Sequence, residues 1–342
     1  LVYVASEATD KITLVRFGPA GARVERVTPI GIMLADPDGP HGITVARDGR
    51  HWYATTAHGA PFGYLWKFAT DTDTPIAKVA LGNFPATAQL TPNGALAFVA
   101  NFNLHGEMVP SSISVVATDE MVEVARITTC TMPHGSRVNP QGTRHYSACM
   151  MDDMLVEIDV GTLAVSRHFM LGKGSEHGME GPPRQHTGSS HHGDPTCSPT
   201  WAQPSANGKQ IFVACNKSDE IVEVDAERWA VRRRLPAGPG VYNLAVSPDG
   251  RLLVGTNKRG QSVSAFDIAT GGQAGRIPTM RRVVHGVVVS PDSRYAFVSV
   301  EGVGSEPGTV EVIDLQALRT VATVDVGQMA GGIDFWRSEP SR

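Results

Sequence analysis

Six segments of this chain repeat one pattern, in which two short apolar strands are joined by a turn resembling Pro-Asp-Gly. The segments are PHGITVARDGRHWYAT (40–55), PATAQLTPNGALAFVA (85–100), PHGSRVNPQGTRHYSA (133–148), PTWAQPSANGKQIFVA (199–214), VYNLAVSPDGRLLVGT (241–256) and VHGVVVSPDSRYAFVS (284–299). Most of these turns recur after about 45 residues, which is typical of an array of similar units arranged in a ring or a stack.

Each unit has room for four strands, as a propeller blade does. The unit that begins at residue 199 shows all four, with turn residues at every junction. They are expected at 200–204, 210–215, 221–225 and 230–235.

The two ends of the chain complement each other. LVYVAS (1–6), KITLVRF (11–17) and RVERVTPI (23–30) match the second, third and fourth strands of a unit, and AGGIDFW (330–336) matches the missing first strand. We therefore predict a single all-β domain over residues 1–342, a seven-bladed β-propeller of four-stranded blades. The C-terminal strand joins the N-terminal blade and closes the ring, which leaves no open strand edge. The alternative, an open solenoid, would need polar caps that the sequence does not show.

Two phrases carry a family resemblance. VSPDGRLLVGTNKRGQSVSAFDIATG (246–271) and LVYVASEATDKITLV (1–15) resemble the YVTN-type propeller repeat, and the resemblance extends over nearly the whole chain. More distant relatives of that family are the propellers of nitrous oxide reductase, which holds a copper cluster, and of haem-containing nitrite reductase. The resemblance implies a propeller fold, and it leaves the function open because the repeat motif itself carries no chemistry.

A column of histidines is the main functional signal. When the repeats are aligned on their turns, His41, His134 and His285 share one position, at which the other repeats have Ala86, Thr200 and Tyr242. The first strand of a blade lines the central channel, so we expect the three imidazoles to converge there. Imidazole is a common ligand of copper, iron and zinc. We predict that the three histidines bind one transition metal, with copper favoured and iron or zinc as the other candidates; a histidine that merely occupies a strand start is the alternative.

Further histidines are expected on the same face. His58 and His105 lie in turns between the second and third strands, and we predict that one serves as a further ligand or a general base. The long connection 173–198 should cover the same face along an irregular path without a fifth strand. From it, His191 and His192 are predicted metal ligands, unless this Gly/Ser/His/Pro segment is only a surface loop.

These features favour a metal-dependent redox enzyme that acts on a small molecule at a histidine-lined hub. One alternative is a non-catalytic binding propeller of the surface, periplasmic or haem-carrier type. Another is an enzyme resembling the lactonase or lyase propellers, although these often use acidic ligands with calcium or magnesium, which argues against them here.

Composition limits the classes of partner. The chain has 30 Lys and Arg residues against 34 Asp and Glu residues, and no basic stripe that would suit nucleic acid. No apolar stretch approaches the length that a membrane span needs. The expected partners are a small-molecule substrate and a protein bound on one propeller face. We expect a periplasmic or secreted location, with a signal peptide that this sequence does not include.

Four cysteines leave several interpretations open. Cys130 and Cys197 each lie just ahead of a repeat, so a disulfide between them is geometrically feasible if those repeats are neighbours. Cys149 and Cys215 occupy equivalent positions of the same two repeats. One structural disulfide, or four small buried side chains, would also fit this pattern.

Overall fold

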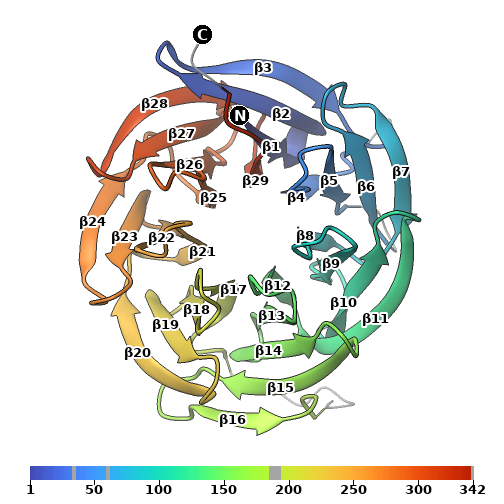
Figure 1. The fold of residues 1–342 in the computed structure, drawn as a ribbon, viewed down its shortest axis with the longest axis vertical. Helices are drawn as coiled ribbons and strands as arrows, with labels where there is room; N and C mark the ends of the chain where they lie inside the picture. The colour runs from blue at the N-terminus through green and yellow to red at the C-terminus, as the bar shows by residue number, and fades with distance from the viewer. Residues whose placement is uncertain (33–35, 59–61, 185–193, 340–342) are drawn as a thin grey trace.

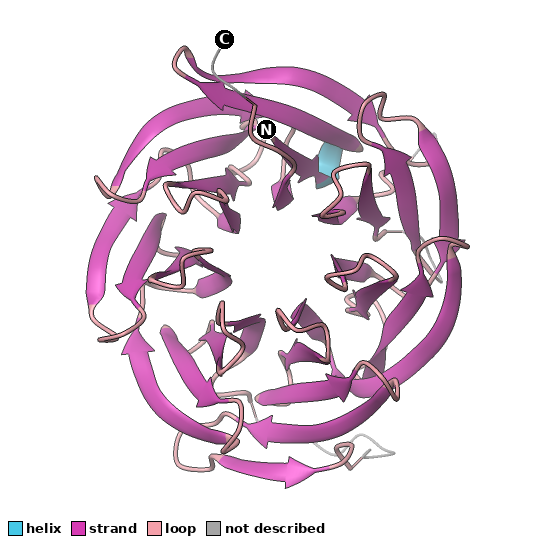
Figure 2. Cartoon of the chain, viewed as in Figure 1, coloured by secondary structure: helices cyan, strands magenta, loops and turns pink. Residues whose placement is uncertain are grey.

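The computed structural model describes residues 1–32, 36–58, 62–184 and 194–339 of the chain. Short antiparallel sheets are arranged as a ring around a central axis (Figure 1). The helical content of the described residues is one short turn, Glu7–Thr9 (Figure 2). None of the helical structure in these parts of the chain is long and apolar enough to cross a membrane.

The strands fall into four classes by their distance from the axis. The inner strands are β4 (Pro40–Val45), β8 (Pro85–Leu90), β12 (Pro133–Val138), β17 (Pro199–Pro204), β21 (Val241–Val246), β25 (Val284–Val289) and β29 (Ala330–Phe335). The second strands are β1 (Val2–Ser6), β5 (His51–Thr56), β9 (Leu96–Asn101), β13 (Arg144–Cys149), β18 (Gln210–Cys215), β22 (Leu252–Asn257) and β26 (Tyr295–Val300). The third strands are β2 (Lys11–Gly18), β6 (Tyr64–Ala69), β10 (Pro110–Ala117), β14 (Met154–Asp159), β19 (Glu220–Asp225), β23 (Ser262–Asp267) and β27 (Gly308–Asp314). The outer strands are β3 (Gly21–Pro29), β7 (Pro75–Ala80), β11 (Val122–Thr131), β15 (Ala164–Met170), β20 (Ala230–Pro236), β24 (Gln273–Pro278) and β28 (Arg319–Val326).

The pairing of these strands corrects the predicted architecture. In the described residues the ring consists of five four-stranded sheets and one nine-stranded sheet, so the prediction of seven four-stranded blades is wrong. In the nine-stranded sheet β12 pairs in parallel with β17, through Gly135 and Trp201. A Cβ atom at position 135 would lie only 2.4 Å from the carbonyl oxygen of Thr200, so the close approach requires glycine there.

A fifth strand extends the same sheet on its outer side. β16 (His177–Glu180) belongs to the long connection and pairs antiparallel with β15. The expectation of an irregular path without a fifth strand is therefore wrong. The outer edge of β15 offers unpaired backbone groups, and a short segment satisfies them without any apolar pattern of its own.

The C-terminal strand closes the ring, as predicted. β29 pairs antiparallel with β1, with Val2 opposite Phe335, and the sheet continues through β2 and β3. The backbone amine of Leu1 also donates to the carbonyl of Arg337 at 2.9 Å. Figure 1 shows both ends of the chain at this sheet.

A residue with a left-handed backbone precedes each inner strand, two positions before the histidine column. These residues are Gly39, Phe84, Met132, Ser198, Gly240, Val283 and Met329, with φ between 48° and 67°. The recurrence shows that this conformation belongs to the turn between an outer and an inner strand. Val283 is the β-branched member, for which such a backbone is most strained.

The cysteines form two disulfides, Cys130–Cys149 and Cys197–Cys215. The interpretations of a Cys130–Cys197 bond and of a single disulfide are both wrong. In each observed pair, a cysteine ahead of an inner strand reaches the last residue of the second strand that follows it. The hairpin register places Cys149 opposite Pro133 and Cys215 opposite Pro199, close in each case to the cysteine ahead of the inner strand.

Candidate functional site at the hub

Three histidines meet at one end of the central channel. His41, His134 and His285 lie at the start of β4, β12 and β25. The ring centroid of His41 is 5.8 Å from that of His134 and 5.4 Å from that of His285. All three side chains are buried. The structure brings the column together as expected, while the role of these residues as metal ligands stays a prediction.

Two of these imidazoles are oriented by the backbone of the neighbouring inner strand. Nδ1 of His41 donates to the carbonyl of Ala86 at 2.8 Å, and Nδ1 of His134 donates to the carbonyl of Thr200 at 3.0 Å. Because a carbonyl can only accept, Nδ1 of each of these two rings carries a proton. The His285 ring lies beside the backbone of Gly331 on β29.

Burial keeps His134 and His285 uncharged. Desolvation, followed by the charge of His41, lowers the pKa of His134 to about 3. Desolvation, followed by the charge of Lys258, lowers the pKa of His285 well below its ordinary value. Both rings are therefore neutral at physiological pH, and one nitrogen of each ring carries a lone pair.

Tyr242 stands between His134 and His285. Its ring centroid is 5.4 Å from that of His134 and 4.8 Å from that of His285. Burial raises the pKa of its hydroxyl, which therefore stays protonated and donates to Nε2 of His134 at 3.0 Å. Tyr242 occupies the same column as the histidines, so the repeat pattern contained this residue.

A second column of charged residues faces the histidines. Glu7 and Glu301 directly follow the second strands β1 and β26. A carboxylate oxygen of Glu7 lies 3.8 Å from Nε2 of His41, and one of Glu301 lies 3.8 Å from Nε2 of His285. The sequence analysis missed this column. The column consists of the residue just after each second strand. In chain order these residues are Glu7, Ala57, Phe102, Met150, Asn216, Lys258 and Glu301.

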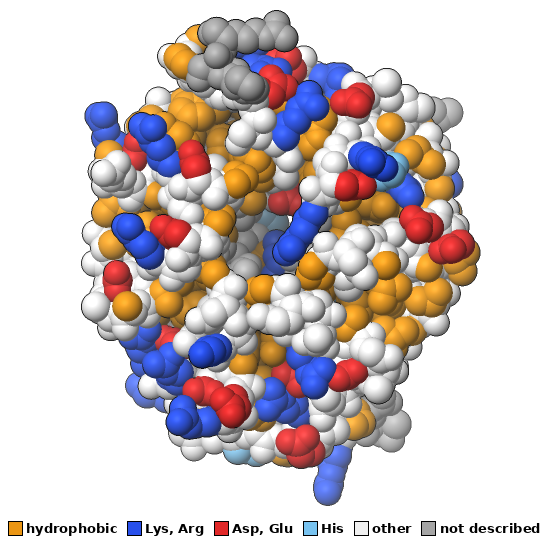
Figure 3. Space-filling view, in the orientation of Figure 1, with side chains coloured by type: hydrophobic (Ala, Val, Ile, Leu, Met, Phe, Trp, Pro, Cys, Tyr) orange, Lys and Arg blue, Asp and Glu red, His pale blue; other side chains and the backbone are white. Residues whose placement is uncertain are grey.

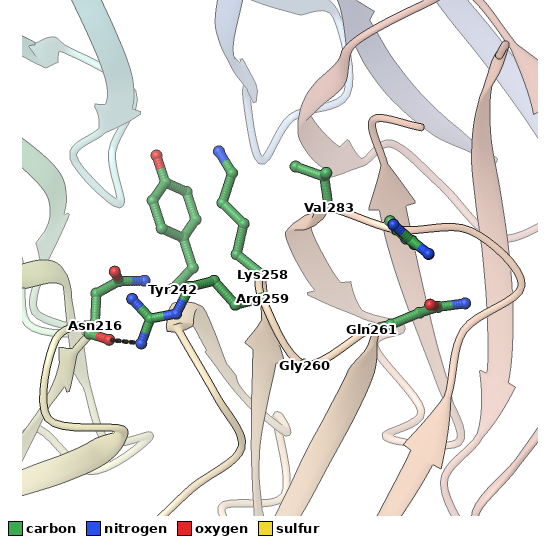
Figure 4. A pocket seen from close by; sticks show the side chains of 8 residues that line it. Asn216, Tyr242, Lys258, Arg259, Gly260, Gln261 and Val283 are labelled. Carbon is green, nitrogen blue, oxygen red and sulfur yellow. Dashed lines mark hydrogen bonds between the residues drawn. The ribbon is translucent and has the colours of Figure 1, made fainter. Parts of the chain in front are cut away.

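Lys258 is the one basic residue of the second column. Its Nζ lies 2.8 Å from Glu301 and 4.4 Å from the centroid of the Tyr242 ring. Burial alone would lower its pKa, but Tyr242 and Glu301 outweigh burial and raise it, so the amine stays charged. Figure 4 shows Lys258 and Tyr242 side by side and pointing the same way.

His58 and His105 lie beside the trio. Their ring centroids are 5.8 Å apart, and both rings pack against Phe84, which also contacts His41. Nε2 of His58 forms a 2.6 Å hydrogen bond with Glu7, which raises the pKa of the imidazole. The structure places both residues at the predicted face, and their catalytic roles stay predictions.

The long connection contributes less than expected to this face. His177 begins β16 at the outer edge of the ring and is exposed. β16 therefore lies at the outer edge of the ring, and the prediction that the whole connection covers the hub stays a prediction. His191 and His192 lie outside the described residues.

The candidate metal ligands at the hub do not surround one common point in this structure. Within the described residues, no group of three or more histidine, cysteine, aspartate or glutamate side chains is arranged so that it could hold a metal ion. The positions of Tyr242 and Lys258 explain this, since Tyr242 separates His134 from His285 and Lys258 is already paired with Glu301.

Comparison with known proteins supports the fold alone. No family model matches this chain, and no curated protein matches it. Among solved structures, hydrazine synthase of Kuenenia stuttgartiensis is similar, with a TM-score of 0.67 at 19% sequence identity over 87% of this chain and 90% of that one. The ring is therefore a propeller-like fold shared with that protein. The YVTN-type resemblance remains a resemblance of short motifs.

Proposed function

We propose that the hub binds a transition metal, with copper favoured and iron second, and carries out redox chemistry on a small molecule. The observation that carries this proposal is the orientation of His41 and His134. Each donates Nδ1 to a backbone carbonyl, which leaves Nε2 as the nitrogen that would bind the metal, in His134 once Tyr242 no longer occupies it. Histidines that bind metals usually have this second hydrogen bond, which fixes the tautomer and the ring.

The chemistry of the surrounding donors fits such a metal. Neutral imidazoles together with the carboxylates of Glu7 and Glu301 form a nitrogen and oxygen set that suits copper or iron. The metal would supply one-electron chemistry, while Tyr242 and His58 orient His134 and Glu7 through hydrogen bonds. His41 and His285 are the central donors of the proposal, because each faces a carboxylate across 3.8 Å.

Metal content is the decisive measurement. Purified protein is reconstituted with copper, iron or zinc, desalted and analysed for its elements. We expect about one metal ion per chain in the wild type and little in His41→Ala and His285→Ala, since removing one donor usually weakens a site severely. His51→Ala is the matched control, because His51 begins β5, a strand whose other end faces the hub. A wild type without metal, or variants that keep it, would overturn the proposal.

A non-catalytic binding propeller is the second candidate. It is favoured by the apolar side of the hub, where Phe84, Phe102 and Met132 are buried in one cluster beside the histidines. A protein that binds small molecules but retains no metal would select this alternative.

The two disulfides support a periplasmic or secreted location as part of the proposal. Disulfides persist mainly in oxidising compartments. Thiol labelling of the unreduced protein from its native source should find no free cysteine, whereas reactive thiols in that material would contradict this location.

A further inference from the structure

A pocket of about 790 Å³ lies beside the hub. It is formed by the turn between β22 and β23, the connection ahead of β25 and the start of β21, and its lining includes Tyr242, Lys258, Arg259, Gln261, Arg282 and Val283 (Figure 4). We propose that this pocket binds a small organic carboxylate. As the substrate class of the hub reaction, this inference rests on the proposed function; as a binding site, it stands independently.

The charges around the pocket favour an anion. Lys258, Arg259 and Arg282 line it, and no acidic residue does. Lys258 is paired with Glu301, and Arg259 with Asp219 at 2.7 Å. These pairs neutralise the nearest carboxylates.

Arg282 is the basic residue left over. Its side chain has no acidic partner among the described residues, and the residue is exposed. A free guanidinium offers two parallel N–H donors that match the geometry of a carboxylate. We therefore assign the carboxylate of the ligand to Arg282.

The far side of the pocket leads to the histidines. Tyr242 lines the pocket and also donates to His134, and its ring packs against that of His285. A molecule held at Arg282 would lie along Tyr242, with its other end toward the hub. The volume is in the range of sites that enclose small organic molecules, roughly 300–1,000 Å³.

Calorimetric titration of the metal-free protein tests the binding. Benzoate, succinate and acetate are the probes, and benzamide is the uncharged analogue of benzoate. We expect at least one carboxylate to bind. If benzoate binds, benzamide should bind roughly tenfold more weakly or worse. Arg282→Gln should weaken carboxylate binding roughly tenfold, as the loss of a charged hydrogen bond would. Arg276→Gln is the matched control, because Arg276 is an exposed arginine on β24 of the same sheet.

The outcomes separate this inference from the metal proposal. No heat with any carboxylate up to about 10 mM, equal binding of benzamide and benzoate, or an Arg282→Gln variant that binds as the wild type does would each overturn the carboxylate site. Metal content of Arg282→Gln should equal that of the wild type. Carboxylate binding in a protein that never retains metal would confirm the pocket and overturn only the redox proposal.

Discussion

Side chains at the hub take their positions from the neighbouring inner strands. The hydroxyl of Thr87 donates to the carbonyl of His134 at 2.6 Å, and the hydroxyl of Thr200 donates to the carbonyl of Tyr242 at 2.7 Å. Nδ1 of His134 in turn donates a hydrogen bond to the carbonyl of Thr200. His134 is therefore held both through its backbone and through its ring, which leaves little freedom for the atoms that face the channel.

The Tyr242 hydroxyl competes with a metal for Nε2 of His134. Tyr242→Phe should lower the free energy of unfolding by about 1–2 kcal/mol, because a buried acceptor loses its donor. The same variant should bind copper at least as tightly as the wild type, since Nε2 of His134 becomes free. Urea unfolding and copper titration check the two expectations, and a loss of copper binding would show that Tyr242 is itself a ligand.

Buried histidines should make the protein sensitive to acid. Burial lowers the pKa values of His134 and His145 to about 3. Burial also lowers the pKa of His285 well below its ordinary value. In the unfolded chain these groups protonate near pH 6.5, so below that pH the unfolded state binds more protons. Stability is therefore full above pH 6.5 and falls toward pH 3, by up to about 1.4 kcal/mol per pH unit for each histidine.

His145 allows this to be tested away from the hub. Its ring stacks on Phe98 with centroids 4.7 Å apart, and neither nitrogen has a partner among the described residues. His145→Leu should reduce the dependence of unfolding free energy on pH between 6 and 4 by about 1.4 kcal/mol per unit. Urea titrations at several pH values measure it; an unchanged slope would mean that His145 is protonated in the folded protein.

At the scale of strands, the repeats predicted from the sequence are the inner two strands of each sheet. The alternating pattern of 40–55, for example, corresponds to β4 and β5. β16 could not be predicted, because HGME has no alternation and pairs only where β15 offers a free edge. The contact between β12 and β17 depends on a tertiary approach at Gly135, which no local pattern encodes.

The candidate site was predictable to a similar extent. The histidine column was visible because a histidine is rare at an apolar strand start. Glu7 and Lys258 were not, because in the sequence a charged residue at the start of a turn cannot be told from an ordinary solvent-exposed one. Only the ring, which brings β1, β22 and β26 to one axis, distinguishes the two cases.

The connection ahead of β25 contains removable strain. Val283 has φ 66°, where the equivalent connections ahead of β4 and β21 use Gly39 and Gly240. Val283→Gly should raise the free energy of unfolding by about 1 kcal/mol, because relief of the left-handed backbone exceeds the entropy cost of glycine. Val321→Gly on β28, where φ is ordinary, should instead destabilise by a similar amount. Thermal unfolding compares the two, and destabilisation by Val283→Gly would refute the strain.

At the scale of the molecule, the ring encloses a central hollow. Figure 3 shows this hollow on one face, with acidic and basic side chains interspersed around it rather than gathered into a patch of one sign. The hollow exists only because β29 completes the sheet of β1, β2 and β3. The hub histidines, which come from three different sheets, depend on that closure for their mutual distances.

Removal of the closing strand should therefore affect the entire protein. Deletion of residues 328–342 exposes the buried edge of β1 and should lower the melting temperature by more than about 10 °C or abolish cooperative unfolding. Among the described residues, deletion of 338–342 removes the exposed ion pairs of Glu339, and it should change stability by less than about 1 kcal/mol. A longer deletion that still unfolds cooperatively near the wild-type temperature would contradict the closure.

The same pairing sets an order of events during synthesis on the ribosome. β1 leaves the ribosome long before its partner β29, because the other strands of the ring lie between them in the chain. Throughout translation the nascent chain therefore carries an apolar strand with one unpaired edge, which invites pairing with other chains. The ring can be completed only after β29 has left the exit tunnel, so the histidine hub, which depends on this closure, is assembled late in folding.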